Sequence, residues 1–171
     1  LEIGFGGGEH LAYRAVARPA TLHLGCEPFE NGVASLLARI DAEGISNIRL
    51  HCGDARETLA MLPDAALRRI DILYPDPWPK RRHRKRRFFG PDTLSLMARC
   101  LKPGGEVRFA TDIDNYAAWT LARIAADPAF EWEAQGPADW LEPWEGWPGT
   151  RYEAKAKRAG RVPSYLTFRR S

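Results

Sequence analysis

The amino-acid sequence predicts an α/β protein whose sheet is doubly wound and mostly parallel, with helices on both faces. Two observations predict this class. Short apolar runs bounded by turn residues alternate along the chain with segments of helical periodicity. A glycine-rich turn follows the first apolar run at once. In such sheets ligands bind beside the carboxyl ends of the strands, so we expect the functional residues in the loops that follow the strands.

The first half of the chain alternates three strands with three helices. In order, these are a strand at 1–3, a helix at 10–17, a strand at 21–26, a helix at 30–43, a strand at 48–52 and a short helix at 55–62. Pro19 and Pro63 follow the first and third helices, because proline rarely continues a helix. Apolar residues at helical spacing from Val33 to Ile40 mark the second helix, and Gly44 stands where it should end.

The second half continues the alternation and then becomes rich in turns. We expect a strand at 70–74, a helix at 92–101, a strand at 107–111, a helix at 116–126, and strands at 130–134 and 165–169. Pro91 precedes the first of these helices, and residues 102–105 are expected to end it. Residues 136–149 are rich in Pro and Trp and are expected to form a loop.

Size and composition predict one domain in a reducing compartment. The 171 residues, 44% of them apolar, suffice for one core, so we expect a single domain over 1–171. Cys26, Cys52 and Cys100 form no CxxC pair, and the histidines lack ligand spacing, so we expect no metal and a cytoplasmic location. No apolar run could span a membrane. The chain starts at Leu1, inside a strand and without Met, so we expect that an N-terminal segment is missing.

Positive charge is concentrated in two segments. Residues 80–87 read KRRHRKRR and carry +7, while residues 151–171 carry +6. Since the net charge is only +3, the rest of the chain carries −10. Two basic blocks on an acidic body favour a localised binding site for a phosphate backbone. A solvated charged loop or a targeting-type basic run is the alternative.

The first turn is suited to a cofactor that has no pyrophosphate. It reads Glu2-Ile3-Gly4-Phe5-Gly6-Gly7-Gly8. A dinucleotide-binding turn would need a third glycine at position 9, where Glu9 stands. The turn fits E-x-G-x-G-x-G, the pattern of class I methyltransferases, with Gly4 and Gly6 close to the methionine end of the cofactor and Glu2 near its ammonium group. A plain tight turn is the alternative.

Acidic residues stand at the ends of the next three strands. Glu27 is placed to accept hydrogen bonds from two ribose hydroxyls. Asp54 could receive an adenine amino group, cap the next helix, or do both. Asp76 lies between Pro75 and Pro77, which stiffen the loop at the position where class I methyltransferases present their target-facing residues. A rigid structural turn is the alternative.

Several separated motifs make the resemblance specific. The chain resembles the bacterial type of tRNA (guanine-N7)-methyltransferase at Pro75-Asp76-Pro77-Trp78-Pro79-Lys80, a motif that the basic run follows at once. The resemblance continues at Thr111-Asp112, at Tyr116-Ala117 and at Thr150-Arg151-Tyr152-Glu153, so that it runs from Leu1 to near the C-terminus. It implies a Rossmann-like class I methyltransferase fold with an antiparallel last strand, S-adenosyl-L-methionine as cofactor, and tRNA as partner, methylated at guanosine 46 of the variable loop. It also implies that the protein is a monomer or a homodimer.

The resemblance further implies roles for individual residues. Cofactor contacts are implied for Glu2, Glu27, Asp54 and Asp76, and Asp76 also matches the catalytic position. Contacts to the substrate nucleoside are implied for Lys80, Asp112, Thr150, Arg151, Tyr152 and Glu153. RNA binding is implied for Arg82, His83, Arg84, Lys85, Arg86 and Arg87. The sequence departs from the family around Glu27, where Gly-Cys-Glu-Pro-Phe replaces the commoner Glu-Val-His, but the acid itself is kept.

The chemistry of guanine N7 suits an acidic site. The N7 lone pair can attack a sulfonium methyl group without first losing a proton, so no strong base is needed. We expect Asp76 and Asp112 to orient guanine through its N1–H and amino donors and to stabilise the developing positive charge. Because N7 is shielded by stacking, the guanine must come from a loop or be flipped out. One of four loop tryptophans (Trp78, Trp140, Trp144 and Trp147) could stack on it, and at least two should cover the core.

Three other functions are compatible with parts of the pattern. A methyltransferase for an adenine amino group would show a D/N-P-P-aromatic loop, whereas here a single proline separates Asp76 from Trp78. A non-catalytic RNA-binding protein on the same fold is disfavoured by the intact acids. A nicotinamide-dependent dehydrogenase is disfavoured by Glu9 and by the lack of an obvious hydride-handling His or Tyr–Lys pair.

Overall fold

Seven strands form one sheet in the order β3-β2-β1-β4-β5-β7-β6 in the computed structural model, which describes residues 1–171. The strands are β1 (Glu2–Ile3), β2 (His23–Cys26), β3 (Ile48–His51), β4 (Leu67–Leu73), β5 (Leu101–Thr111), β6 (Phe130–Trp132) and β7 (Ser164–Arg170). Strands β1 to β5 pair with one another in parallel, whereas β7 runs antiparallel to both β5 and β6. The predicted doubly wound, mostly parallel sheet with an antiparallel last strand is therefore confirmed.

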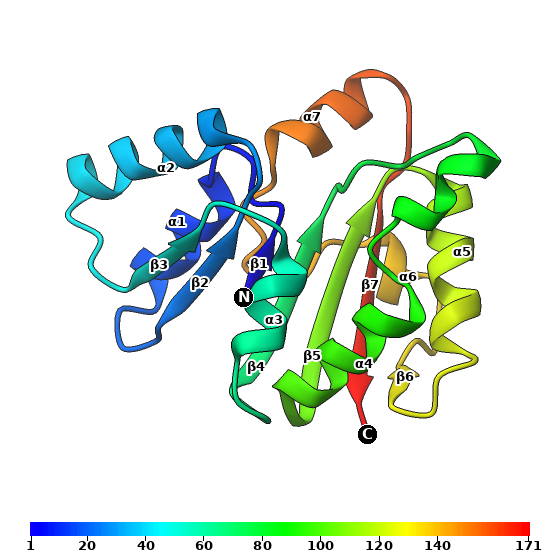
Figure 1. Cartoon of the computed structure of the whole chain (residues 1–171). Helices are drawn as coiled ribbons and strands as arrows, with labels where there is room; N and C mark the ends of the chain where they lie inside the picture. Colours follow the sequence, from blue (N-terminus) through cyan, green and yellow to red (C-terminus); the bar gives the residue numbers. More distant parts are fainter.

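Helices cover both faces of this sheet (Figure 1). They are α1 (Glu9–Ala17), α2 (Glu30–Glu43), α3 (Ala55–Met61), α4 (Pro91–Cys100), α5 (Asp114–Ile124), α6 (Ala138–Leu141) and α7 (Arg151–Arg158), with a 3-10 helix η1 (Arg81–Arg86). In the view of Figure 1, α3, α4 and α5 lie in front of the sheet and α1 lies behind it. No helix is long and apolar enough to cross a membrane.

The core follows from the alternation of side chains along each strand. Ile72 of β4 and Phe109 of β5 are fully buried in a cluster shared with α3, α4 and α5. The next residues, Leu73 and Ala110, belong to a different cluster, centred on Tyr165 of β7. A third cluster joins α1 and α2 to the sheet. The sheet is thus buried on both faces, as a doubly wound arrangement requires.

Some predicted boundaries are wrong. Residues 102–105 were expected to end a helix, but they belong to β5, which begins at Leu101 and pairs with a lengthened β4. The predicted loop at 136–149 contains the single helical turn α6, because the Asp139 carboxylate accepts hydrogen bonds from the backbone N–H groups of Gln135 and Gly136.

Helix α7 was not predicted, although the sequence carries a signal for it. Thr150 caps the helix, and its hydroxyl oxygen accepts a hydrogen bond from the backbone N–H of Glu153 at 3.1 Å. Thr-x-x-Glu is the pattern of a capping box. The four residues at 150–153 therefore mark a helix start as well as a family motif.

The strand order changes direction between β1 and β4. From β1 the chain adds β2 and β3 on one side, and it then returns to place β4 and β5 on the other. Such a switch point opens a crevice at the carboxyl ends of the two strands. The glycine-rich turn after β1 and the Pro-rich loop after β4 meet there.

Candidate functional site

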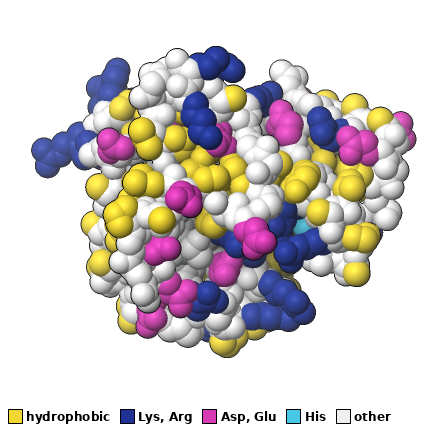
Figure 2. Space-filling model, turned by 180° about the vertical axis from the view of Figure 1, so that it is seen from behind, with side chains coloured by type: hydrophobic (Ala, Val, Ile, Leu, Met, Phe, Trp, Pro, Cys, Tyr) yellow, Lys and Arg dark blue, Asp and Glu magenta, His cyan; other side chains and the backbone are white.

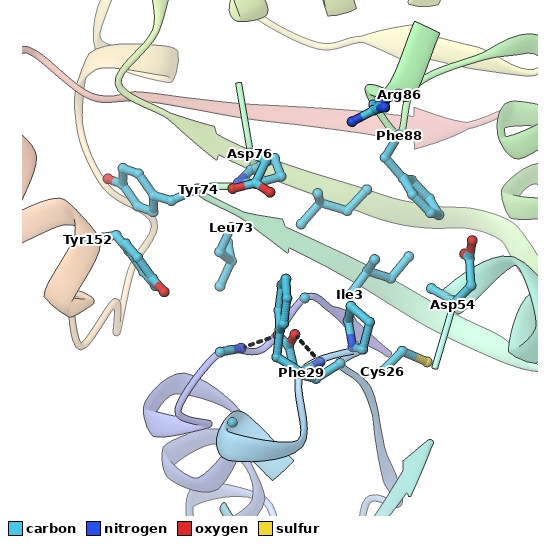
Figure 3. Close-up of a pocket in the computed structure, with 18 of the residues that line it drawn as sticks. Ile3, Cys26, Phe29, Asp54, Leu73, Tyr74, Asp76, Arg86, Phe88 and Tyr152 are labelled. Atoms are coloured by element: carbon cyan, nitrogen blue, oxygen red, sulfur yellow. Dashed lines mark hydrogen bonds between the residues drawn. The ribbon is translucent and has the colours of Figure 1, made fainter. Parts of the chain in front are cut away.

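A pocket of about 550 Å³ lies at the carboxyl ends of β1 and β4. Its lining comes from the glycine-rich turn, the loops after β2, β3 and β4, the η1 segment and the start of α7. Figure 3 shows Tyr152 and Asp54 toward opposite ends of the pocket, with Leu73 and Asp76 between them. Six segments thus converge where the topology alone places a ligand.

The glycine-rich turn approaches the pocket with its backbone. Gly4 and Gly6 both line it, with φ angles of 71° and 57°, in the left-handed region that glycine adopts without strain. A Cβ atom at Gly6 would lie 3.3 Å from the guanidinium of Arg151 and 3.5 Å from the ring of Tyr152. The turn and α7 are therefore packed closely enough that a side chain at Gly6 would have to push α7 residues aside.

Glu27 holds two loops of the pocket together. Its carboxylate accepts hydrogen bonds from the backbone N–H of Gly6 at 2.8 Å and from that of Phe29 at 3.1 Å, drawn as dashed lines in Figure 3. The side chain is almost fully buried, yet it also lines the pocket. Each carboxylate oxygen has a second lone pair, so Glu27 can still accept from a ligand hydroxyl.

Glu2 pairs with a residue of α1. Glu2 is buried, one of its carboxylate oxygens lies 2.7 Å from Nδ1 of His10, and the pocket lining begins only at Ile3. Burial raises the pKa of Glu2, and the hydrogen bond to His10 opposes that shift. Because the strand alternates, Glu2 faces His10 of α1 and anchors that helix, and its contact with a cofactor ammonium stays a prediction.

Asp54 lies at the far end of the pocket and caps α3. One carboxylate oxygen accepts from the backbone N–H of Arg56 at 2.9 Å, and the other lies 3.0 Å from the Arg56 guanidinium. The predicted capping role is thus confirmed, and the half-exposed side chain also lines the pocket. Phe29, which is 70% exposed, and Phe88 add aromatic surface to the lining.

The loop around Asp76 is held in a strained conformation. Tyr74 and Trp78 have φ angles of 51° and 41°, which are unfavourable for residues with large side chains. The Trp78 ring has the Arg86 guanidinium 4.7 Å from its centroid and the edge of His83 nearby. Asp76 lines the pocket between these two positions. Strain of this kind persists only where the surroundings fix the backbone, and it is common at functional sites.

The basic run is divided by the structure into exposed residues and one buried anchor. Arg82 and Lys85 are exposed, His83 and Arg84 are partly exposed, and Arg86 lines the pocket. Arg87 is 2% exposed; it donates hydrogen bonds to the carbonyl oxygen of Pro77 and to both oxygens of Asn115. The expectation that Arg87 contacts RNA is therefore corrected, because its donors are already used inside the protein.

The expectation that Glu153 contacts a nucleoside is also corrected, since the Glu153 side chain is buried. Its carboxylate accepts hydrogen bonds from Trp147 Nε1 at 2.5 Å, from the Tyr165 hydroxyl at 2.7 Å and from Lys157. Burial pushes the pKa of Glu153 upward, but these three donors outweigh it and leave the pKa below its ordinary value. The anchored carboxylate fixes the first turn of α7, and so places Arg151 and Tyr152 in the pocket wall.

Two further predicted residues lie outside the pocket lining. Lys80 is exposed at the start of η1. Asp112 follows β5 at the same edge of the sheet as Asp76, but its carboxylate pairs with Nε of Arg161 at 2.5 Å. A ligand that uses the Asp112 carboxylate would compete with this ion pair.

Three of the four loop tryptophans pack against the protein. Trp144 donates to the Thr167 hydroxyl, Trp147 donates to Glu153, and Trp140 packs against the main core. The expectation that at least two of them cover the core is borne out. Only Trp78 belongs to the pocket lining.

Sequence reasoning missed several residues of the lining. Phe29, Arg56 and Phe88 line the pocket, and the Arg56 guanidinium lies 5.2 Å from the centroid of the Phe88 ring. Phe29 and Arg56 stand two residues after Glu27 and Asp54, so their places after the strand ends were the available signal. Phe88 follows the basic run and had no such signal.

Comparison with known proteins gives a consistent result. A family model described as "Putative methyltransferase" matches residues 1–164. The tRNA (guanine-N(7)-)-methyltransferase of Mesorhizobium japonicum is 56% identical over 168 residues, which cover 98% of this chain and 72% of the relative. The protein of the same description from Rhizobium meliloti is 57% identical over 171 residues, which cover 100% of this chain and 74% of the relative.

Solved structures show the same fold at low sequence identity. The 16S rRNA (adenine(1408)-N(1))-methyltransferase from Catenulisporales acidiphilia, solved with its cosubstrate SAM, is 19% identical with a TM-score of 0.64; the match covers 99% of this chain and 84% of that one. An rRNA methylase from Streptococcus thermophilus is 13% identical with a TM-score of 0.62, over 99% and 84% of the two chains. These similarities concern the fold alone.

Proposed function

Since this chain belongs to the family of tRNA (guanine-N(7)-)-methyltransferases, we propose that it transfers a methyl group from S-adenosyl-L-methionine to N7 of a guanine in tRNA. The observation that carries the proposal is the pocket at the switch point, where Glu27, Asp54 and Asp76 from three successive loops line one cavity. Identity of about 56% over nearly the whole chain supports the same reaction.

The pocket residues fit this cofactor in chemistry and size. A volume of about 550 Å³ is within the range of small-molecule sites. Gly4 and Gly6 would lie against the methionine portion, Glu27 would accept from the ribose hydroxyls, and Asp54 would accept from the adenine amino group. The exposed ring of Phe29 would cover the adenine. When bound, the cofactor supplies a methyl group activated by a sulfonium charge.

The acids of the site suit guanine as the acceptor. Guanine N7 uses its own lone pair to form the new bond, so no side chain has to remove a proton first. Asp76 lies in the middle of the pocket wall, where its carboxylate can orient the base and stabilise the positive charge that the methylated ring acquires. The Tyr74 and Trp78 backbones hold Asp76 in place, so little reorganisation is needed when the base arrives.

The exposed cations around the pocket suit RNA. We assign Lys80, Arg82, His83, Arg84, Lys85 and Arg86 to contacts with the tRNA near the target nucleotide, and Asp112, Thr150, Arg151 and Tyr152 to the surroundings of the nucleoside itself. By the resemblance, the target is guanosine 46 in the variable loop. We further propose that residues 1–171 act as one methyltransferase domain in the cytoplasm.

Identification of the product tests this function directly. The protein is incubated with unmodified bulk tRNA and labelled S-adenosyl-L-methionine, and the product nucleosides are separated and identified by mass spectrometry. We expect the label in 7-methylguanosine, at one position of the tRNA. Label in another nucleoside would overturn the guanine assignment, and absence of label in the presence of measurable cofactor binding would overturn the proposed catalysis.

Glu27→Gln is expected to weaken binding of S-adenosylhomocysteine about 100-fold, close to 3 kcal/mol. The amide would point an N–H₂ group at the backbone donors of Gly6 or Phe29, and it would lose the charge that strengthens a hydrogen bond to a ribose hydroxyl. Isothermal titration calorimetry measures the change. Glu30→Gln, at the exposed start of α2, is the matched control, and a Glu27→Gln affinity within twofold of the wild type would contradict the role.

A further inference from the structure

The exposed side of α7 carries a stripe of cations that begins at the pocket. Arg151, Lys155 and Arg158 stand at positions i, i+4 and i+7, so they share one face of the helix. Glu153 and Ala156 are buried on the opposite face. With a rise of 1.5 Å per residue, the stripe runs for about 10 Å. Its first member, Arg151, lines the pocket, so the stripe leads outward from the site.

Two of these cations have no acidic partner. The ion pairs of the α7 segment use Arg151, which lies 3.7 Å from Glu9, and Lys157, which pairs with the buried Glu153. Lys155 and Arg158 are exposed and make no salt bridge. The only acid of α7 faces inward, so no carboxylate on the helix itself balances the stripe.

The stripe and the η1 segment lie on opposite sides of one pocket. Trp78 and Arg86 form part of the wall on the η1 side, while Arg151 and Tyr152 form the wall on the α7 side. Figure 1 shows α7 above the same end of the sheet as the loop that follows β4. Figure 2, which views the molecule from behind, shows Lys and Arg side chains protruding along its upper edge. Cationic groups therefore border the pocket on two sides.

We propose that α7 binds the phosphates on one side of the target nucleotide, through Lys155 and Arg158, while the η1 segment binds those on the other side. This inference rests on the proposed function and extends it by assigning a second contact surface to the RNA. When a base is flipped out of its stack, the sugar–phosphate backbone has to be held on both sides of that nucleotide. Cations on both sides of the pocket would hold both flanks, whereas η1 alone would hold one.

The arrangement carries a cost that a polyanion would remove. Like charges at i, i+4 and i, i+3 destabilise a helix, and both spacings occur among Arg151, Lys155 and Arg158. Arg151 also stands in the first turn, where the helix dipole disfavours a cation. Phosphates along the stripe would relieve both effects. Lys155 and Arg158 themselves stand in the last turn, where the dipole favours cations, so the cost falls on the spacing and on Arg151.

The salt dependence of tRNA binding tests the proposal. The double variant Lys155→Ala/Arg158→Ala is compared with the wild type by filter binding of an unmodified tRNA transcript over a series of KCl concentrations. We expect the slope of log K against log [KCl] to fall in magnitude by about 2, because each lost phosphate contact removes about 1. At 0.1 M KCl the Kd should rise at least tenfold. Affinity for S-adenosylhomocysteine should stay within twofold of the wild type, which also reports that the variant is folded.

Arg68→Ala/Lys102→Ala is the matched control, because it removes the same charge from the opposite end of the sheet. Both residues are exposed and make no salt bridge. The assignment to α7 would be overturned if the slope of log K against log [KCl] were unchanged in the α7 variant, or if it fell by the same amount in the control. The product assay on the wild type decides the proposed function separately: formation of 7-methylguanosine with an unchanged α7 slope would refute this inference alone. Failure of the wild type to bind tRNA at all would overturn both.

Discussion

Asp76→Asn is expected to lower the turnover number about 100-fold at saturating tRNA, the size of effect seen when one preorganised charge-stabilising group is removed. The amide keeps the shape of the side chain but loses the negative charge that, in the proposed function, would face the methylated guanine. Since Asp76 lines the middle of the pocket, the loss should appear mainly in kcat. Single-turnover measurements with saturating tRNA and cofactor isolate the chemical step.

Two further variants make the test specific. Asp114→Asn, at the exposed start of α5, is the control for loss of a nearby carboxylate outside the pocket, and its turnover should match the wild type. Asp112→Asn examines the neighbouring acid, which is paired with Arg161. If Asp76→Asn and Asp112→Asn both retained the full rate at saturating tRNA, the proposed electrostatic role of the acids would be wrong.

Arg87→Ala is expected to lower the free energy of unfolding by about 3 kcal/mol, the scale on which removal of one partner from a buried polar network destabilises a protein. The variant removes three part-buried hydrogen bonds, to Pro77 and Asn115, and leaves the buried space of the guanidinium empty. It also removes the guanidinium that lies 4.5 Å from the Tyr116 ring centroid. Urea unfolding measures the change.

Lys85→Ala is the matched control within the same basic run. Lys85 is exposed, so its removal should leave the free energy of unfolding within about 0.5 kcal/mol of the wild type. Its loss should weaken tRNA binding instead. Arg87→Lys should recover only part of the stability, because an ammonium group cannot reproduce the fork of donors. If Arg87→Ala were as stable as the wild type and only bound tRNA less well, the residue would be an RNA contact after all.

The fold was largely predictable because its signals are local and repeated. Each local signal indicated one element: an apolar run indicated a strand, helical periodicity indicated a helix, and a residue such as Gly44 indicated a helix end. Together these signals predicted a doubly wound sheet. One error fell where tertiary pairing overrides local signals. Residues 102–105 look like a helix end, yet pairing with β4 draws them into β5.

The sequence was sufficient to predict which loops form the site, but not the direction in which each side chain points. Glu27, Asp54 and Asp76 line the pocket as their positions after strands suggested. Glu2 and Arg87 lie within functional motifs and yet point into the protein, because the direction of a side chain depends on strand alternation and on the turns of η1. A run of like residues does not reveal which member is buried.

The position of β7 in the sheet has a consequence for the newly made chain. Strand β6 precedes β7 in the sequence but pairs only with β7, and β7 in turn lies between β6 and β5. Until residues 164–170 leave the ribosome, one edge of β5 stays open and β6 has no neighbour. The Tyr165 hydroxyl that holds Glu153 arrives with the same strand, so the α7 wall of the pocket is anchored last. During synthesis, the pocket walls built from the glycine-rich turn and the loops after β2 and β3 can therefore form before the α7 wall.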